Sequence, residues 1–330
     1  MIFKGKGILV VVLLSLTAVL IYLDLHFPLI GGLGQVHVDI LNLFRIPRVV
    51  TAVLVGVGIS LAGLNMQVQF RNALAGPSIL GVNTGATIAV ALFLLGTSGT
   101  TLVRSVVWMD IGGFVTMFAI MGAFAILMLI GALSYLFRSN FALLIVGILI
   151  SYFGIAIVSI MQFFAAPEAL QTFIFWTFGS VEALTYNQIG LLAATVLVGI
   201  SLVVLIIGRL NSYLLGDEYA ISMGTDVKKV RILLMASTGL ISGVVTALCG
   251  PIGFVGLAVP HLARLIFRVG DLKTLMIGTL ILGADLMLLA DMLSHTHSSV
   301  VLPINAVTAL LGSPVIVYFL FKQRKKNWMI

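Results

Sequence analysis

The chain alternates long apolar stretches with short polar ones. Seven uncharged stretches are each long enough for the roughly 20 apolar residues that a membrane-spanning helix needs. They are residues 49–70, 72–103, 111–137, 139–167, 183–208, 232–263 and 292–321. The strict alternation typical of membrane β-strands is not seen in them. The pattern therefore predicts an all-α, polytopic membrane protein.

The ends of these stretches divide the chain into ten expected transmembrane helices. Their approximate ranges are 8–27, 48–68, 79–96, 109–134, 141–164, 188–208, 231–249, 252–268, 272–293 and 300–321. The first range resembles a signal peptide but is followed by no small-residue cleavage site, so it is expected to stay as a helix. No polar block is large enough to fold outside the bilayer, which predicts a single transmembrane domain over residues 1–330.

Charge decides the expected orientation. Only 9% of the residues are charged, and the net charge is +7. With both termini in the cytoplasm, fifteen of the eighteen Lys and Arg residues fall on the cytoplasmic side. Because cytoplasmic loops carry an excess of Lys and Arg, this orientation is the expected one. The positive charge then faces the inner leaflet, and no nucleic-acid partner is needed to explain it.

Small residues and helix breakers predict how the spans pack. Small residues four apart let transmembrane helices approach closely, and two spans carry such rows: Ala52, Gly56 and Ser60, and Gly239, Gly243 and Ala247. The stretch "CGPIGFVGLAVPHLARL" contains two prolines, which interrupt a helical ladder. Irregular backbone is tolerated only inside protein or beside a cavity, so this span is expected within the bundle. His261 in it is expected to make a structural hydrogen bond.

Motifs for other classes of protein are missing. The sequence has no G-x-x-x-x-G-K-[ST] loop for ATP and no H-E-x-x-H zinc site. His295 and His297 alone are a weak metal signal, and the single Cys249 excludes an internal disulfide. No catalytic pair is readable, so we expect no enzyme activity, no cofactor and no metal site. Asp285 lies deep in a span and keeps a proton-coupled secondary carrier open as an alternative.

Three segments carry a family resemblance. They are "FRIPRVVTAVLVGVGISLAGLNMQVQFRNALAGPSILGVNTGA", "LLGDEYAISMGTDVKKVR", and "GPIGFVGLAVPHLARL" followed by "LADMLSHTHSSVVLPINAVTALLGSPVIVYFL". In order and spacing they resemble the FecCD-type permease subunits of ATP-binding-cassette (ABC) importers for iron-siderophores, haem and cobalamin. Ala73 departs from the pattern, since the family usually has proline there.

The resemblance implies a permease that works as a pair in a bacterial inner membrane. Two ABC ATPase subunits would lie beneath the pair and a periplasmic binding protein above it. The polar segment 213–228 would form coupling helices that fit the ATPase, with the contact made by Leu215, Gly216, Asp217, Glu218, Ala220, Met223 and Gly224. The apolar Leu214 and Ile221 would otherwise be left in water.

The resemblance also implies a gate and a docking site. The matching gate residues are Asn72 and Leu74 after the second span and Asn140 and Phe141 at the start of the fifth. Arg45 and Arg48 would receive acidic residues of the binding protein. His295 stands where the family often has a third arginine.

Several alternatives stay open on the sequence alone. The cargo is expected to be an iron-siderophore or haem, with cobalamin as the alternative and oxyanions such as molybdate less favoured. Met66, Gln67 and Asn83 are the expected pathway residues. Two identical chains or two related ones could form the pair. A proton-coupled carrier and an intramembrane enzyme are the rival classes, and an ATPase partner would separate them from an importer.

Overall fold

The computed structural model describes residues 2–26, 41–96, 101–136, 140–182, 184–268, 270–295 and 301–327. This part of the chain consists of helices joined by short connections and contains no strand, which confirms the all-α prediction. Seven helices are long and apolar enough to cross a membrane, and three shorter apolar helices fall in the remaining predicted spans. Every one of the ten predicted spans therefore coincides with a helix.

The long helices are α1 (Ile2–His26), α3 (Ile46–Gln69), α5 (Thr101–Leu136), α6 (Asn140–Phe164), α8 (Tyr186–Val204), α11 (Val227–Cys249) and α13 (Leu272–Ser294). The shorter spans are α4 (Val82–Leu94), α12 (Val255–Phe267) and α14 (Ile304–Asn327). Between them lie η1 (Leu41–Arg45), η2 (Pro77–Leu80), α7 (Pro167–Phe178), α9 (Ile207–Leu214) and α10 (Asp217–Ser222). The span predicted from residue 79 begins later because the tight turn η2 ends at Gly81, whose φ of 69° breaks the helix.

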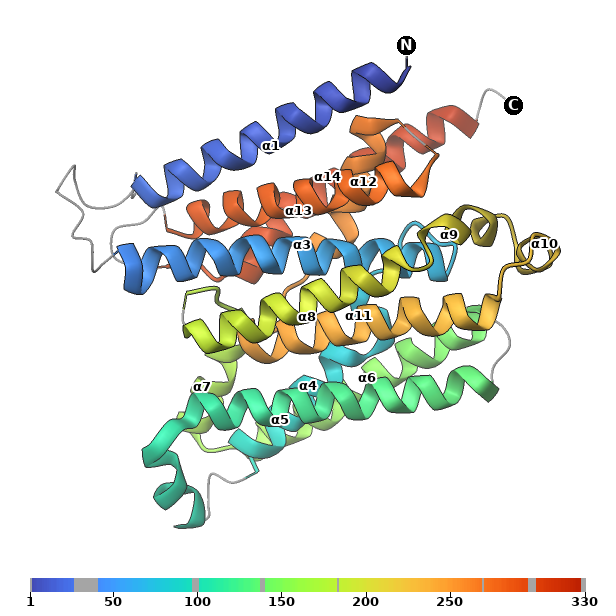
Figure 1. Ribbon diagram of the computed structural model, residues 1–330. Coiled ribbons are helices and arrows are strands. Elements are labelled where there is room, and N and C mark those ends of the chain that lie inside the picture. Colours follow the sequence, from blue (N-terminus) through green and yellow to red (C-terminus); the bar gives the residue numbers. More distant parts are fainter. Residues whose placement is uncertain are drawn as a thin grey trace.

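The helices form a bundle with α3, α11 and α13 inside (Figure 1). The apolar window of α3 is 78% buried, whereas that of α1 is 17% buried and that of α6 is 22% buried. In Figure 1, α1 lies along one edge of the bundle and α5 and α6 along the other. The outer helices therefore present apolar side chains that suit lipid or another membrane subunit.

The two ends of the bundle differ in what they carry. The N-terminus, the C-terminus, α9 and α10 gather at one end, and α7 lies at the other (Figure 1). We call the first the inner end, because the charge distribution predicts that it faces the cytoplasm, and the second the outer end.

Small residues set the closest helix contacts, as the sequence predicted. A Cβ on Gly56 would lie 2.2 Å from the Gly283 carbonyl oxygen, so α3 and α13 touch through their backbones. A Cβ on Gly63 would lie 1.7 Å from the Gly256 oxygen of α12. Gly243 in α11 likewise faces Ala123 of α5. Both predicted rows of small residues therefore lie at helix contacts.

Replacing Gly63 with alanine is expected to lower the free energy of unfolding by about 1–3 kcal/mol, since the added methyl must push α12 away. Gly190→Ala in α8 is the matched control. Nothing lies within 4 Å of its added Cβ, so alanine there should stabilise by about 0.5–1 kcal/mol. Thermal unfolding in detergent measures both, and equal midpoints would contradict the contact.

The irregular span lies within the bundle, as predicted. Pro260 lies inside α12, and both Pro260 and His261 are buried. The His261 ring packs on the Phe319 ring, with centroids 4.0 Å apart. In the described part of the chain neither ring nitrogen has a hydrogen bond of ordinary geometry. The ring also has a polar contact with the Ala73 main chain, and this contact and the aromatic stacking together hold it.

Candidate functional site

The polar segment at the inner end folds into two short helices joined by a glycine. Gly216 has a φ of 127°, a backbone conformation that glycine adopts at little cost, and it separates α9 from α10. Gly216 occupies the cap position of α10, and Asp217 is its first helical residue. Asp226 caps α11, where its Oδ1 accepts from the Lys229 N–H at 3.1 Å. The segment is thus built as two helices lying between α8 and α11.

Apolar side chains of this segment point away from the protein. Leu215 is 69% exposed, Ile221 64% and Met223 60%, while Ala220 is buried against the chain. Gly224 has a φ of 73° and open space where a Cβ would lie. These three exposed side chains, which we call the inner apolar patch, lie at the end of the molecule farthest from α7 (Figure 1).

Asp217 links this segment to the turn that follows α3. Its Oδ1 accepts a short hydrogen bond from Arg71 Nη2, and its Oδ2 lies 3.5 Å from Arg231 Nη2 of α11. Arg71 also donates from Nε to the Tyr213 carbonyl oxygen at 3.0 Å and stacks its guanidinium over the Tyr213 ring. We call Arg71, Asp217 and Arg231 the inner charge link.

Arg71 holds an unfavourable backbone conformation to reach this position. Its φ is 47°, in the left-handed region that residues other than glycine rarely adopt. Such strain persists only where the surroundings over-determine it. Here the contacts to Tyr213 and Asp217 supply that constraint.

The predicted gate residues Asn72 and Leu74 lie in the same turn as Arg71. Asn72 accepts from the Leu74 N–H at 2.9 Å through its Oδ1, and both side chains are exposed. Asn140 and Phe141 form the first turn of α6, and their side chains lie outside the described part of the structure. The inner charge link therefore joins the segment α9–α10 directly to half of the predicted gate.

At the outer end Arg48 lies in an internal ion cluster. Its Nη2 is 2.7 Å from Asp24 Oδ1, and its Nε is 2.9 Å from Asp291 Oδ2. The Arg48 side chain is only 18% exposed. Arg45 donates to the Leu25 carbonyl oxygen at 2.7 Å. Arg48, which was expected to receive acidic residues of the binding protein, is thus already held by two carboxylates of its own chain.

His295 at the outer end is also held by groups of its own chain. Its Nε2 makes a short contact with Glu182 Oε1, and its Nδ1 lies 2.8 Å from the Asp291 carbonyl oxygen. Burial by itself lowers the pKa of His295, but the bonds to Glu182 and to that carbonyl outweigh it and raise the pKa above 6.5. The hydrogen bond with His295 lowers the pKa of Glu182 against the effect of burial.

The His295–Glu182 pair makes the stability of the folded chain depend on pH, and the sign of this dependence follows from the two pKa shifts. The raised pKa of His295 stabilises the folded chain below about pH 6.5, and that stability is lost as pH rises through the folded pKa. The lowered pKa of Glu182 stabilises it above about pH 4.5, and that part is lost as pH falls. Because Glu182 is 39% exposed, the effect should stay below about 1 kcal/mol.

We therefore expect the thermal midpoint in detergent to fall slightly between pH 6 and pH 9. The change should disappear in His295→Gln, which keeps a polar side chain but cannot ionise. A midpoint drop of the same size in His295→Gln would assign the pH dependence to other groups, such as the neighbouring Asp291.

Asp285 lies at a helix contact between α13 and α1. It is 4% exposed, and its Oδ1 accepts from Thr17 Oγ1 at 2.6 Å. The hydrogen-bond partner of the Asp285 carboxyl group is thus the Thr17 hydroxyl of α1. Because α1 runs along the edge of the bundle (Figure 1), this carboxyl is poorly placed to line a central pathway.

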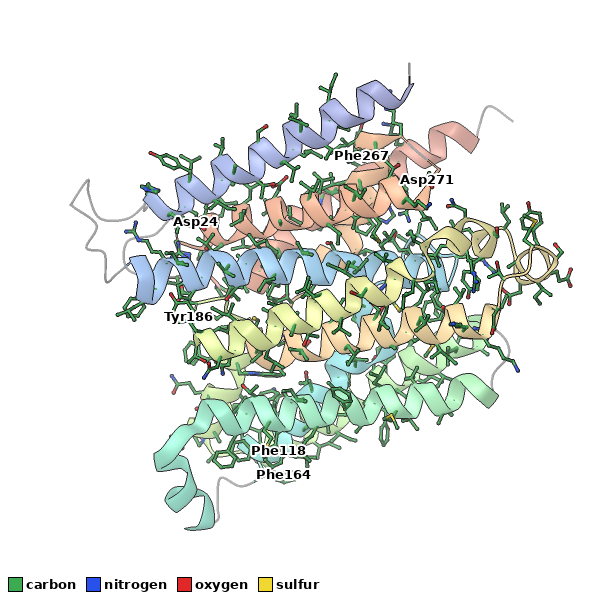
Figure 2. All side chains as sticks on the ribbon, viewed as in Figure 1. Asp24, Phe118, Phe164, Tyr186, Phe267 and Asp271 are labelled. Atoms are coloured by element: carbon green, nitrogen blue, oxygen red, sulfur yellow. The ribbon has the colours of Figure 1, made fainter. Side chains whose placement is uncertain are left out.

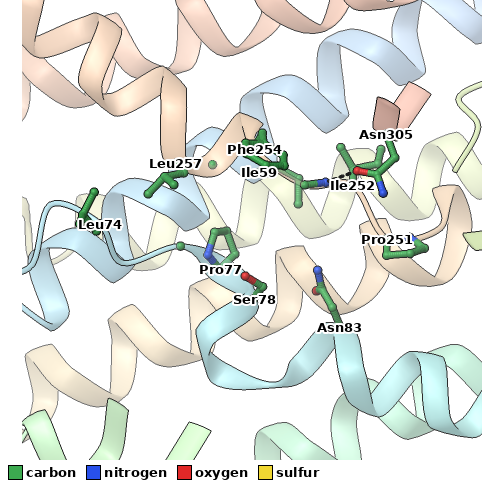
Figure 3. A pocket seen from close by; sticks show the side chains of 13 residues that line it. Ile59, Leu74, Pro77, Ser78, Asn83, Pro251, Ile252, Phe254, Leu257 and Asn305 are labelled. Atoms are coloured by element: carbon green, nitrogen blue, oxygen red, sulfur yellow. Dashed lines mark hydrogen bonds between the residues drawn. The ribbon is translucent and has the colours of Figure 1, made fainter. Parts of the chain in front are cut away.

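A cavity of about 460 Å³ lies beside α3. Its wall is formed by α3, the turn after it, η2, the start of α4, the connection between α11 and α12, and the starts of α12 and α14 (Figure 3). Leu74 and Asn83 both line it. The other expected pathway residues, Met66 and Gln67, are buried and do not line the cavity. Gln67 accepts from Arg264 and donates to the main-chain oxygen of Leu257, which does line it. Figure 2 shows how densely side chains fill the rest of the bundle.

The described residues contain no group of three or more His, Cys, Asp or Glu that could hold a metal. The arrangement is instead a helical bundle with an internal cavity, a turn at the cavity's inner edge and an exposed apolar patch beyond that turn. This arrangement suits a multi-pass membrane transport subunit.

The chain belongs to the FecCD transport family, which it matches over residues 7–322. It is 32% identical over 286 residues to the hemin transport system permease protein HmuU of Yersinia pestis, covering 86% of this chain and 83% of that one. It is 30% identical over 299 residues to a "probable iron chelatin transport system permease protein" of Helicobacter pylori, covering 91% and 87%.

A solved structure described as an inward-facing conformation of a metal-chelate type ABC transporter has the same fold. It superposes with a TM-score of 0.84 at 26% identity, over 96% of this chain and 99% of that one. The family resemblance that the three sequence segments carried is thereby confirmed.

Proposed function

We propose that this chain is the permease subunit of an ABC importer that moves a metal chelate, an iron-siderophore or haem, through a bacterial inner membrane. The whole chain would act as one permease domain. Its family membership, the names of its relatives and its solved structural neighbour support the transport class and the metal-chelate cargo. Hydrolysis of ATP belongs to a separate subunit, and this chain is not an enzyme.

The inner apolar patch is the observation that carries the ATPase contact. Leu215, Ile221 and Met223 expose most of their apolar surface at the inner end, which costs free energy unless a partner covers them. Asp217 and Glu218 lie beside them and would make polar contacts at the rim. The remaining residues Gly216, Ala220 and Gly224 shape the backbone of this segment.

The inner charge link supplies a route from the ATPase to the gate. A partner that moves α10 also moves Asp217, and Asp217 holds Arg71 in the turn that carries Asn72 and Leu74. Asn140 and Phe141 of α6 would be the other gate residues of this chain. A second permease chain would contribute its own gate residues. The same geometry suits an identical or a related second chain.

Docking of a periplasmic binding protein is proposed for the outer end. Arg45 is only partly buried, and within the described ranges its guanidinium has one hydrogen bond, to a main-chain oxygen. Arg48 and His295 are already paired with Asp24, Asp291 and Glu182. An acidic residue of the binding protein would therefore have to share Arg48 or His295 with these carboxylates. Arg45 is therefore the principal docking group, with Arg48 and His295 as secondary ones.

Assembly tests this proposal first. The chain, expressed with the genes beside its own, is expected to co-purify with an ABC ATPase in equal amounts. Isolation as a stable complex without any ATPase, in several mild detergents, would contradict the proposed class.

A further inference from the structure

Two asparagines project from different helices into the 460 Å³ cavity. Asn83 is the second residue of α4, and Asn305 is the second residue of α14. Figure 3 shows Pro77, Ser78 and Asn83 on one side of the cavity, and Phe254, Ile252 and Asn305 on the other. The two amides thus belong to facing walls that are more than 200 residues apart in the sequence.

Neighbouring groups hold the oxygen atom of each amide. Asn305 Oδ1 accepts from the Gly253 N–H at 3.1 Å. Because a main-chain N–H can only donate, the oxygen must face it. Asn83 Oδ1 accepts from the Thr246 hydroxyl at 3.0 Å. Each oxygen is therefore engaged by the protein, which leaves the two NH₂ groups as the donors available to the cavity.

The rest of the wall is apolar or neutral. Ile59, Pro77, Ile252 and Leu257 supply hydrocarbon, Ser78 supplies a hydroxyl, and no charged side chain lines the cavity in the described part of the chain. Sites of this kind, mostly apolar with a few fixed polar groups, are typical of small-molecule recognition. A bare ion would lose its hydration here without a compensating charge.

We propose that Asn83 and Asn305 form a cargo-contacting pair that donates hydrogen bonds to oxygen atoms on the surface of a metal chelate. The fitting ligand has an apolar body and carbonyl or carboxylate oxygens at its periphery, so a small free oxyanion is disfavoured. This inference rests on the proposed importer function and adds residues and a ligand chemistry to it.

The cavity lies next to the predicted gate turn. Leu74, in the predicted gate turn, lines it together with Asn83. A chelate held by the two amides would therefore lie next to the gate turn, which the inner charge link connects to α10. Binding and gating are then adjacent events in one compartment of the chain.

The test uses the assembled complex in liposomes with its binding protein, and measures uptake of a ferric trihydroxamate, haem and cobalamin. Asn83→Asp and Asn305→Asp keep the side-chain shape but replace the donor with an acceptor that repels oxygens. Each is expected to slow uptake of the transported probe at least about tenfold, which corresponds to about 1.4 kcal/mol. Co-purification with the ATPase confirms that each variant folds.

Asn187→Asp is the matched control. Asn187 is also the second residue of a spanning helix, α8, but it is exposed and outside the cavity, so uptake should stay unchanged. Asn83→Gln keeps the donor and should retain more uptake than Asn83→Asp. Thr246→Val frees the Asn83 amide to turn and should give an intermediate rate.

Unchanged uptake in both Asp variants, or equal loss in Asn187→Asp, would overturn the proposed pair. If the unmodified complex takes up none of the three probes, the proposed chelate chemistry is overturned. Co-purification of the ATPase would still support the importer class. The two failures are therefore distinguishable.

Discussion

Replacing Ile221 and Met223 together with glutamate is expected to separate this chain from its ATPase. Both side chains are more than half exposed at the inner end, and each should be worth about 1.5–3 kcal/mol when fully buried against a partner. Losing both, and placing charges in the contact, should weaken the complex at least about 100-fold. Co-purification and light scattering of the purified chain measure the loss.

Tyr186→Glu is the control for this change. Tyr186 is 58% exposed at the outer end, where Figure 2 labels it at the start of α8. An added charge there should leave the ATPase bound. If the double variant still purifies with a full complement of ATPase, the inner apolar patch is not the coupling surface.

Neutralising Asp217 is expected to uncouple ATP hydrolysis from transport. In Asp217→Asn the side chain keeps its shape, but its attraction to Arg71 and Arg231 is lost. The ATPase should still bind and hydrolyse ATP, since the inner apolar patch remains, while uptake per ATP falls about tenfold. Arg71→Gln should do the same, and the double variant should be no worse than either single one, because both remove the same link.

Asp226→Asn is the matched control within the same segment. Asp226 caps α11, and asparagine caps a helix equally well. Asp226 forms no ion pair in the described ranges, so coupling should survive this change. Additive losses in Arg71→Gln and Asp217→Asn would show that the two residues act separately.

Much of the fold was predictable because hydrophobic length and small-residue spacing are local properties. All ten spans and both small-residue contacts followed from short local stretches of the sequence. The short helices α4 and α12 were harder to delimit, since Gly81 and Pro251 interrupt apolar stretches that hydropathy alone would run together.

The site was predictable only in part because its contacts join distant segments. The pairing of Arg48 with Asp24 and Asp291 could not be read from the sequence, and neither could that of Arg71 with Asp217. Asn305 was missed since nothing near it in the chain marks a cavity. The exposed apolar residues of 213–223, in contrast, could be recognised from the sequence as hydrophobic residues within a polar segment.

The contact of Asp285 with Thr17 argues against the alternative hypothesis of a proton-coupled secondary carrier. A coupling carboxylate in a secondary transporter should line the substrate path. Asp285 instead lies between α1 and α13, away from the cavity that Leu74 and Asn83 line. Its position is better explained as a hydrogen bond that holds α1 against the bundle.

Uptake into liposomes tests the central claim most directly. Liposomes that contain the chain with its co-purified ATPase, supplied with the binding protein and haem or a ferric trihydroxamate, are energised either with ATP or with a pH gradient. The importer account predicts uptake that requires ATP, the ATPase and the binding protein, and that a pH gradient cannot replace. Uptake by the chain alone, driven by a pH gradient and abolished in Asp285→Asn, would contradict it.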